Sequence, residues 1–255
     1  MLQKPKYLGA EYAEQFQDAS VVEAYRHRPP YPAELFEILA RLIKGEQRRV
    51  LDVGSGIGYI ARGLVERVEQ LDAVDFSQHM IELGKRLPNG DSPRLRWLYG
   101  RVEDVVLDPP YGLVTAGESL HWMDFNTVLP RFHEVLTPGG YLAIVEHETI
   151  PDPWSLLSEI IPRYRTNKDT YQPYDMVAEL ERYGLFQKVG EKMTAPESFV
   201  QSIEDYIESY HARSSLSRER MGAAQAHAFD QEARTILLKK YSDGFVSLQV
   251  AAYLV

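Results

Sequence analysis

Apolar and polar positions along the chain predict a repeated strand–helix pattern between residues 50 and 146. Short apolar runs that are typical of buried strands occur at residues 50–53, 71–75, 95–99, 113–116 and 141–146. Segments between these runs carry apolar residues at helical spacing; one example is Val128, Phe132 and Val135. Strands that alternate with helices favour an α/β fold with a doubly wound, mostly parallel sheet.

The pattern differs on both sides of this core. Residues 11–27 and 32–44 are predicted to be helical, and the prolines between them interrupt any continuous helix. After residue 150 we expect proline-interrupted helices at 151–183 and a strand at 186–192. An amphipathic helix should follow, with an apolar face formed by Phe199, Ile203, Tyr206, Ile207 and Tyr210. A helix at 218–240 and a strand at 245–255 complete the chain.

Composition narrows the classes of function. The 255 residues are 44% hydrophobic and 25% charged, a balance that permits a full core. No apolar run reaches the length of a membrane span, the first six residues lack the apolar stretch of a signal peptide, and cysteine is absent. We therefore expect a cytoplasmic protein without disulfides or a membrane anchor.

Charge bears on the choice of partner. The formal net charge is −9, and the sequence has no dense run of lysine or arginine. A surface of this sign repels phosphate backbones. The sequence therefore favours a small-molecule partner over nucleic acid.

Three glycines follow the first apolar run at alternate positions, Gly54, Gly56 and Gly58, and a helical pattern begins after them. Such a strand, bare turn and helix allow a ligand to approach the backbone closely. Asp75 ends the next predicted strand, where a carboxylate can accept hydrogen bonds from both hydroxyls of a ribose. Together these features predict a nucleoside-containing cofactor. The structural alternative for Asp75 is a cap on the following helix.

Residue 59 separates two classes of nucleoside cofactor. A dinucleotide fingerprint requires a glycine there, whereas this chain has Tyr59, which disfavours a nicotinamide-dependent reductase. With Asp52 before the glycines, the segment resembles the first motif of class I S-adenosylmethionine-dependent methyltransferases. The resemblance covers residues 20–148 and extends to the segments Tyr25–Pro32, Gly100–Asp104, Thr115–Trp122 and Val135–Gly140. The chain is most similar to a small-molecule, type-11-like branch that includes relatives of trans-aconitate methyltransferase.

This resemblance implies a seven-stranded, mostly parallel Rossmann-like sheet with a C-terminal antiparallel hairpin and a helical cap. It divides the chain into an N-terminal helical lid (residues 1–45), an S-adenosylmethionine-binding core (46–150), and cap insertions together with the last two strands (151–255).

The same resemblance implies a cofactor site. The glycines and Ser55 would line the methionine end, Asp75 would hold the ribose, and neighbouring residues would flank the adenine. Many relatives have aspartate in place of Arg101, so no side-chain bond from this residue to the adenine is expected. The full set of expected cofactor residues is Tyr25, Arg28, Tyr31, Asp52, Gly54, Ser55, Gly56, Gly58, Asp75, Phe76, Met80, Arg101, Val102, Glu103, Glu118 and Ser119.

The expected activity is methyl transfer to an O or N atom of a small acceptor. His121 is the candidate base, because neutral imidazole suits that role near neutral pH, although a carboxylate acceptor would need no base. Structural alternatives remain for several residues: Tyr25, Tyr31 and Trp122 as core packing, and His121 as a hydrogen-bonded structural histidine.

Other interpretations remain open on the sequence alone. A sensor or partner subunit that binds the cofactor without catalysis would carry the same motifs. The tetrapeptide Asp108-Pro109-Pro110-Tyr111 matches that of amino-directed DNA methyltransferases, but it precedes the predicted fourth strand instead of following it. Residues 146–148, Glu-His-Glu, could hold a metal together with His121, but no spaced metal motif supports this, and we expect no metal.

Overall fold

The computed structural model describes residues 5, 8, 13–167, 174–213 and 215–255. Its strands are β1 Arg49–Val53, β2 Gln70–Asp75, β3 Leu95–Tyr99, β4 Tyr111–Gly117, β5 Leu136–Ile150, β6 Lys192–Met193, β7 Glu197–Ser202 and β8 Phe245–Leu254. Its α-helices are α2 Ala19–Tyr25, α3 Ala33–Leu42, α4 Tyr59–Leu64, α5 Gln78–Arg86, α6 Phe125–Val135, α7 Pro153–Leu156, α8 Ile161–Tyr164, α9 Met176–Arg182, α10 Ile203–His211, α11 Arg218–Met221 and α12 Ala223–Lys240. Short 3₁₀ helices are η2 Glu14–Gln17, η3 Val65–Arg67 and η4 Leu120–Trp122.

All strands belong to one sheet with the order β3-β2-β1-β4-β5-β8-β6, and β7 also pairs with β8. Strands β1 to β5 pair in parallel, whereas β5, β6 and β7 each pair with β8 in antiparallel fashion. β6 and β7 share one edge of β8, so the eight strands fill seven positions. The mostly parallel α/β sheet with a C-terminal antiparallel strand pair is thus confirmed. The strand order reverses between β1 and β4, the point where open α/β sheets bind ligands.

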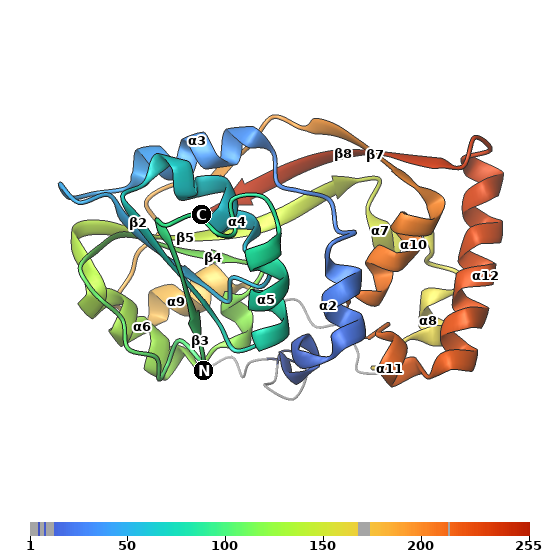
Figure 1. The fold of residues 1–255 in the computed structure, drawn as a ribbon, viewed down its shortest axis with the longest axis horizontal. Helices are drawn as coiled ribbons and strands as arrows, with labels where there is room; N and C mark the ends of the chain where they lie inside the picture. Colours follow the sequence, from blue (N-terminus) through green and yellow to red (C-terminus); the bar gives the residue numbers. More distant parts are fainter. Residues whose placement is uncertain (1–4, 6–7, 9–12, 168–173, 214) are drawn as a thin grey trace.

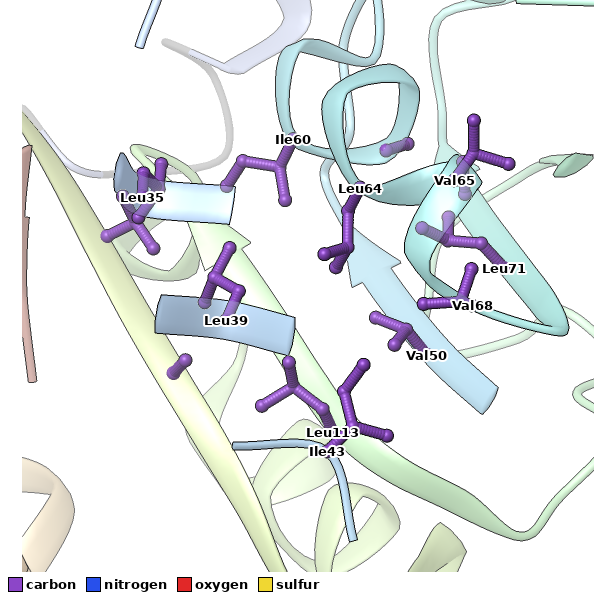
Figure 2. Close-up of a cluster of buried hydrophobic side chains, with 14 of the residues drawn as sticks. Leu35, Leu39, Ile43, Val50, Ile60, Leu64, Val65, Val68, Leu71 and Leu113 are labelled. Atoms are coloured by element: carbon purple, nitrogen blue, oxygen red, sulfur yellow. The ribbon is translucent and has the colours of Figure 1, made fainter. Parts of the chain in front are cut away.

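Helices cover both faces of the sheet, because successive strand residues point to opposite sides. Val50 of β1 packs under Leu39 of α3 and Leu64 of α4, as Figure 2 shows. Its neighbour Leu51 lies in the opposite layer with Phe132 of α6. Both layers are fully buried, as the continuous apolar runs of the central strands require.

The cap is a second hydrophobic unit built on the far ends of the long strands. β5 and β8 extend from the core to helices α7, α8, α10, α11 and α12 (Figure 1). Along β8, Ala252 and Leu254 pack in the core, whereas Val246, Leu248 and Val250 pack with the cap helices. Helix α2 lies between α5 and α10 and so connects the core side to the cap (Figure 1).

Several predicted elements beyond residue 150 were wrong in their bounds. The strand expected at 186–192 is displaced, since pairing with β8 begins at Lys192 and resumes at Glu197. The helix expected from Phe199 begins at Ile203, because Phe199 belongs to β7 and Ser202 caps α10 by accepting a hydrogen bond from Asp205 N. The predicted helix 218–240 is divided at position 222, and residues 11, 12 and 168–173 of other predicted helices lie outside the described residues.

Candidate active site

A cavity of about 90 Å³ lies at the carboxyl ends of β1, β2 and β4, against the N-terminal segment. Its walls come from the turn after β1, the tip of β2, and the loops after β3 and β4. Eleven expected cofactor residues line it: Tyr25, Gly54, Gly56, Asp75, Phe76, Met80, Arg101, Val102, Glu103, Glu118 and Ser119. The motif resemblance therefore identified residues that the fold brings together, although no sequence signal pointed to Phe16, Val74 or Met123, which also line this cavity.

The glycine turn and Asp75 are joined by hydrogen bonds. Gly56 N donates to Asp75 Oδ2 at 2.7 Å, and Ser77 N donates to Asp75 Oδ1 at 2.8 Å. Asp75 therefore holds the turn and the backbone of Ser77, while Ser77 itself caps α5 by accepting a hydrogen bond from Met80 N. Asp75 also lines the cavity. At Gly54 φ is +62°, and a Cβ there would lie 2.5 Å from the Cβ of Ser119, so only glycine fits.

Burial changes the acidity of two carboxyl groups at this turn. Burial raises the pKa of Asp75 to about 6, against the lowering effect of the bonds from Ser77 N and Gly56 N. Burial likewise raises the pKa of Asp52 to about 7, although Thr115 donates a hydrogen bond to Asp52 Oδ1. Two carboxyl groups that hold protons near pH 6–7 at one turn indicate a functional site.

The turn also carries buried polar atoms that fit a ligand. Ser55 Oγ and Asp52 Oδ2 are both buried without a close hydrogen-bond partner among the described residues, although the backbone of Ala61 also acts on the Asp52 carboxyl group. Both residues line a cavity of about 40 Å³ beside the first one. An amino acid group bound there would supply the missing partners. These atoms and the bare glycine cradle therefore fit the methionine end of S-adenosylmethionine.

The segment between α2 and α3 covers this turn. Tyr59 Oη donates to the carbonyl oxygen of Arg28 at 2.9 Å and lies 3.3 Å from that of Tyr25. Arg28 Nη1 donates to the Tyr25 hydroxyl at 3.0 Å. The ring of Tyr31 packs edge-on against Tyr59 and His147. Tyr25, Arg28 and Tyr31 thus pack together at the site and also line its cavities.

A larger cavity of about 290 Å³ lies between the sheet edge and the cap. It shares Phe16, Tyr25, Glu118 and Trp122 with the first cavity. His121, the candidate base, lines this second cavity, with its ring 4.7 Å from that of Trp122. His147 of the Glu-His-Glu segment also lines this cavity, close to His121 as the sequence suggested. Sequence reasoning did not identify two other wall residues, Trp154 and Arg213, because the cap region carries no motif.

Some candidate residues lie outside these cavities. Gly58 is buried against Trp97, where a Cβ would lie 2.6 Å from the Trp97 ring, so its role in the structure is packing. Tyr111 of the Asp-Pro-Pro-Tyr segment begins β4 at its amino end and donates a hydrogen bond to buried Asp72. This tetrapeptide is therefore at the sheet edge opposite the cavities. That position argues against a base-stacking role.

Membrane-spanning helices and clustered metal ligands are both absent from the part of the chain that the structure describes. Within residues 13–167, 174–213 and 215–255 no helix has both the length and the apolar character needed to cross a membrane. Nor do three or more histidine, aspartate or glutamate side chains gather there as a metal site. His147 Nε2 instead lies 3.4 Å from the carbonyl oxygen of Pro30.

Comparison with known families agrees with this geometry. Residues 50–140 match a family model described as a methyltransferase domain. A solved structure from Anaeromyxobacter dehalogenans, proposed to be a type II methyltransferase, superposes with a TM-score of 0.61 at 22% identity and covers 89% of this chain and 95% of its own. That likeness concerns the fold. Residues 50–140 are thus similar to a methyltransferase domain, in a chain with the α/β fold of that solved structure.

Three curated relatives are each similar over slightly less than half of the chain. An uncharacterized methyltransferase of Mycobacterium tuberculosis is 35% identical over 49% of this chain and 50% of its own length. A malonyl-[acyl-carrier protein] O-methyltransferase of Halalkalibacterium halodurans is 28% identical over 43% and 42%. A tRNA 5-carboxymethoxyuridine methyltransferase of Escherichia coli is 33% identical over 44% of each. The chain thus spans about half the length of the relatives it matches, and their named acceptors differ.

Proposed function

We propose that this chain transfers the methyl group of S-adenosylmethionine to an O or N atom of a small-molecule acceptor. The junction of two cavities carries this proposal. The first contains the glycine turn and Asp75, and the second, larger cavity shares Tyr25, Glu118 and Trp122 with it. This arrangement suits a cofactor and an acceptor that meet at a common wall.

S-adenosylmethionine supplies an electrophilic methyl group on a sulfonium when it is bound. The work of the protein is then to align the two reactants and to exclude water. Asp75 would accept the ribose hydroxyls, while Phe76 and Met80 would flank the adenine. The segment that Tyr59 holds in place, with Tyr25 and Arg28, would close the site.

His121 is the proposed base for an acceptor that must lose a proton. It lines the acceptor cavity, and imidazole can accept a proton near neutral pH. For an acceptor that is already anionic, His121 would only orient it. A His121→Ala variant with full turnover on a hydroxyl or amine acceptor would contradict the assignment as base.

Two other functions are distinguished by experiment. The tRNA methyltransferase relative supports a nucleic-acid acceptor as a second candidate, against the net charge of −9. A sensor would bind the cofactor and produce no S-adenosylhomocysteine. Incubation of the protein with labelled S-adenosylmethionine and either a panel of small acids, alcohols and amines or bulk tRNA separates all three.

The primary test is calorimetric titration with S-adenosylmethionine, S-adenosylhomocysteine and NADH, with Asp75→Ala alongside. We expect binding of both sulfur nucleosides and its loss in the variant, with no binding of NADH. Absence of binding by either sulfur nucleoside to the folded wild-type protein would refute the proposed function.

A further inference from the structure

The acceptor cavity contains two arginines that come from distant parts of the sequence. Arg28 belongs to the segment between α2 and α3, and Arg213 follows α10 in the cap. The guanidinium of Arg213 lies 4.8 Å from the ring centre of Tyr210 and 5.5 Å from that of Trp154. Arg28 lies 5.0 Å from the ring centre of Tyr25. Aromatic rings therefore orient both cations in the cavity wall.

Neither guanidinium is saturated by the protein. Arg28 Nη1 donates to the Tyr25 hydroxyl at 3.0 Å, and Arg213 Nη1 donates to the Ser209 carbonyl at 2.9 Å. Within the described residues, neither arginine forms a salt bridge with a carboxylate. Each guanidinium has five N–H donors in a planar fork. Donors therefore remain available for a ligand in the cavity.

The two positive charges also act on each other and on a neighbouring histidine. Burial lowers the pKa of Arg213, and the charge of Arg28 lowers it further. Burial, followed by the charges of Arg28 and Arg213, lowers the pKa of His147 to about 4. His147 is therefore neutral at pH 7, and it contributes no positive charge to the cavity.

Three carboxylates line the same cavity, and one of them acts on both arginines. The charge of Glu118 is felt by both guanidiniums: in Arg213 it opposes the lowering of the pKa by burial and by Arg28, and in Arg28 it adds to the effect of Tyr25 against burial. Glu118 Oε1 also accepts a hydrogen bond from His147 N at 2.8 Å. Asp152 Oδ2 accepts from Ser155 N at the start of α7, and Glu148 is exposed. Of these carboxylates, Glu118 alone acts on both half-buried guanidiniums, so the two arginines leave one positive charge without a counter-charge. Because such a charge is costly to bury, a second anion would stabilise Arg28 and Arg213.

Four aromatic side chains, Trp122, Trp154, Phe16 and Tyr206, also line the space, together with polar residues such as Thr149 and Ser209. The aromatic rings offer a surface on which an apolar or ring-shaped part of a ligand can pack. We infer that the acceptor is a small organic acid whose carboxylate binds Arg28 and Arg213 and whose apolar body packs on these rings. The inference rests on the proposed function and adds the chemical class of the acceptor.

The test measures binding of simple acids to the protein saturated with S-adenosylhomocysteine. The probes are benzoate, phenylacetate and hexanoate, each compared with its primary amide and with phenyl phosphate, and followed by the fluorescence of the cavity tryptophans. We expect at least one acid to bind about tenfold or more tightly than its amide, because charge-assisted bonds exceed neutral ones. Arg213→Gln should reduce this acid-to-amide ratio at least fivefold, and Arg213→Lys should restore part of it.

Arg163→Gln is the matched control, since Arg163 lies on the exposed side of α8 and pairs with Glu232. It should leave the ratio unchanged, and affinity for S-adenosylhomocysteine should be the same in all variants. Acids that bind no better than amides, tighter binding of phenyl phosphate, or an unaltered ratio in Arg213→Gln would each overturn the inference. Failure of S-adenosylhomocysteine itself to bind would instead count against the proposed function.

Discussion

The acidity of Asp75 leads to a quantitative prediction about cofactor affinity and pH. The carboxyl group is 6% exposed, accepts hydrogen bonds from two backbone N–H groups, and has its pKa raised by burial to about 6. Only the ionised form can use all its oxygen lone pairs as acceptors for ribose hydroxyls. Bound cofactor should therefore lower this pKa, and protonation should oppose binding.

The sign and size of the effect follow from this pKa. Affinity for S-adenosylhomocysteine should be full above pH 7 and should be lost as the pH falls through about 6. With one proton to remove, binding at pH 5 should be about tenfold weaker than at pH 7. Asp75→Asn should remove the part of this slope that lies near pH 6, so that only the part near pH 7, due to Asp52, remains. It should also weaken binding at pH 7 by roughly 10- to 100-fold, the magnitude of one hydrogen bond to a charged group.

The assay is isothermal titration with S-adenosylhomocysteine between pH 5.0 and 7.5. Asp52→Asn is the control, because Asp52 is the other carboxyl group at this turn, with a pKa of about 7. The part of the slope near pH 6 should persist in Asp52→Asn. A flat profile for the wild-type protein, or a slope near pH 6 that survives in Asp75→Asn and disappears in Asp52→Asn, would refute the reasoning.

Three substitutions test other parts of the fold. Tyr59→Phe removes the hydroxyl that holds the segment between α2 and α3 over the glycine turn. Titration should show that S-adenosylhomocysteine binds about fivefold more weakly, and an unchanged melting temperature should confirm that the variant is folded. Tyr111→Phe should cost about 1–3 kcal/mol in urea unfolding, because it leaves a buried carboxylate short of a donor, and cofactor affinity should not change. Gly54→Ala should abolish cofactor binding, because the added Cβ clashes with Ser119. Gly139→Ala is the control: its φ is +74° but no atom lies within 4 Å, so it should cost only about 1–2 kcal/mol of stability. Equal cofactor binding by the two variants would contradict this account.

The cofactor half of the site could be predicted from sequence because it is made of contiguous signals. The turn at Gly54 and Gly56 needs a positive φ that glycine supplies, and Asp75 ends a strand whose apolar run is visible. Parallel strands bring such turns to one edge of the sheet. Local sequence and global topology therefore agree for residues 50–120.

The acceptor half could not be predicted in the same way. Arg213 reaches the cavity from the segment after α10, and Arg28 reaches it from the segment before α3. The distance between these two arginines along the sequence hides the fact that they line one cavity. The strand at 197–202 was missed because Phe199 and Ile203 are four residues apart, a helical spacing. The start of α10 had a readable signal in the sequence Ser202-Ile-Glu-Asp205, a serine followed three residues later by an acid.

Tyr59 links the choice of cofactor to the construction of the acceptor cavity. In a dinucleotide site the equivalent position is the third glycine, which allows the helix to pack closely on the strand. Here the position carries a phenol, whose hydroxyl donates to the carbonyl of Arg28. The guanidinium of Arg28 lies in the wall of the acceptor cavity. The substitution that disfavours a nicotinamide cofactor thus also fixes a cation where the acceptor would bind, so both halves of the site depend on one side chain.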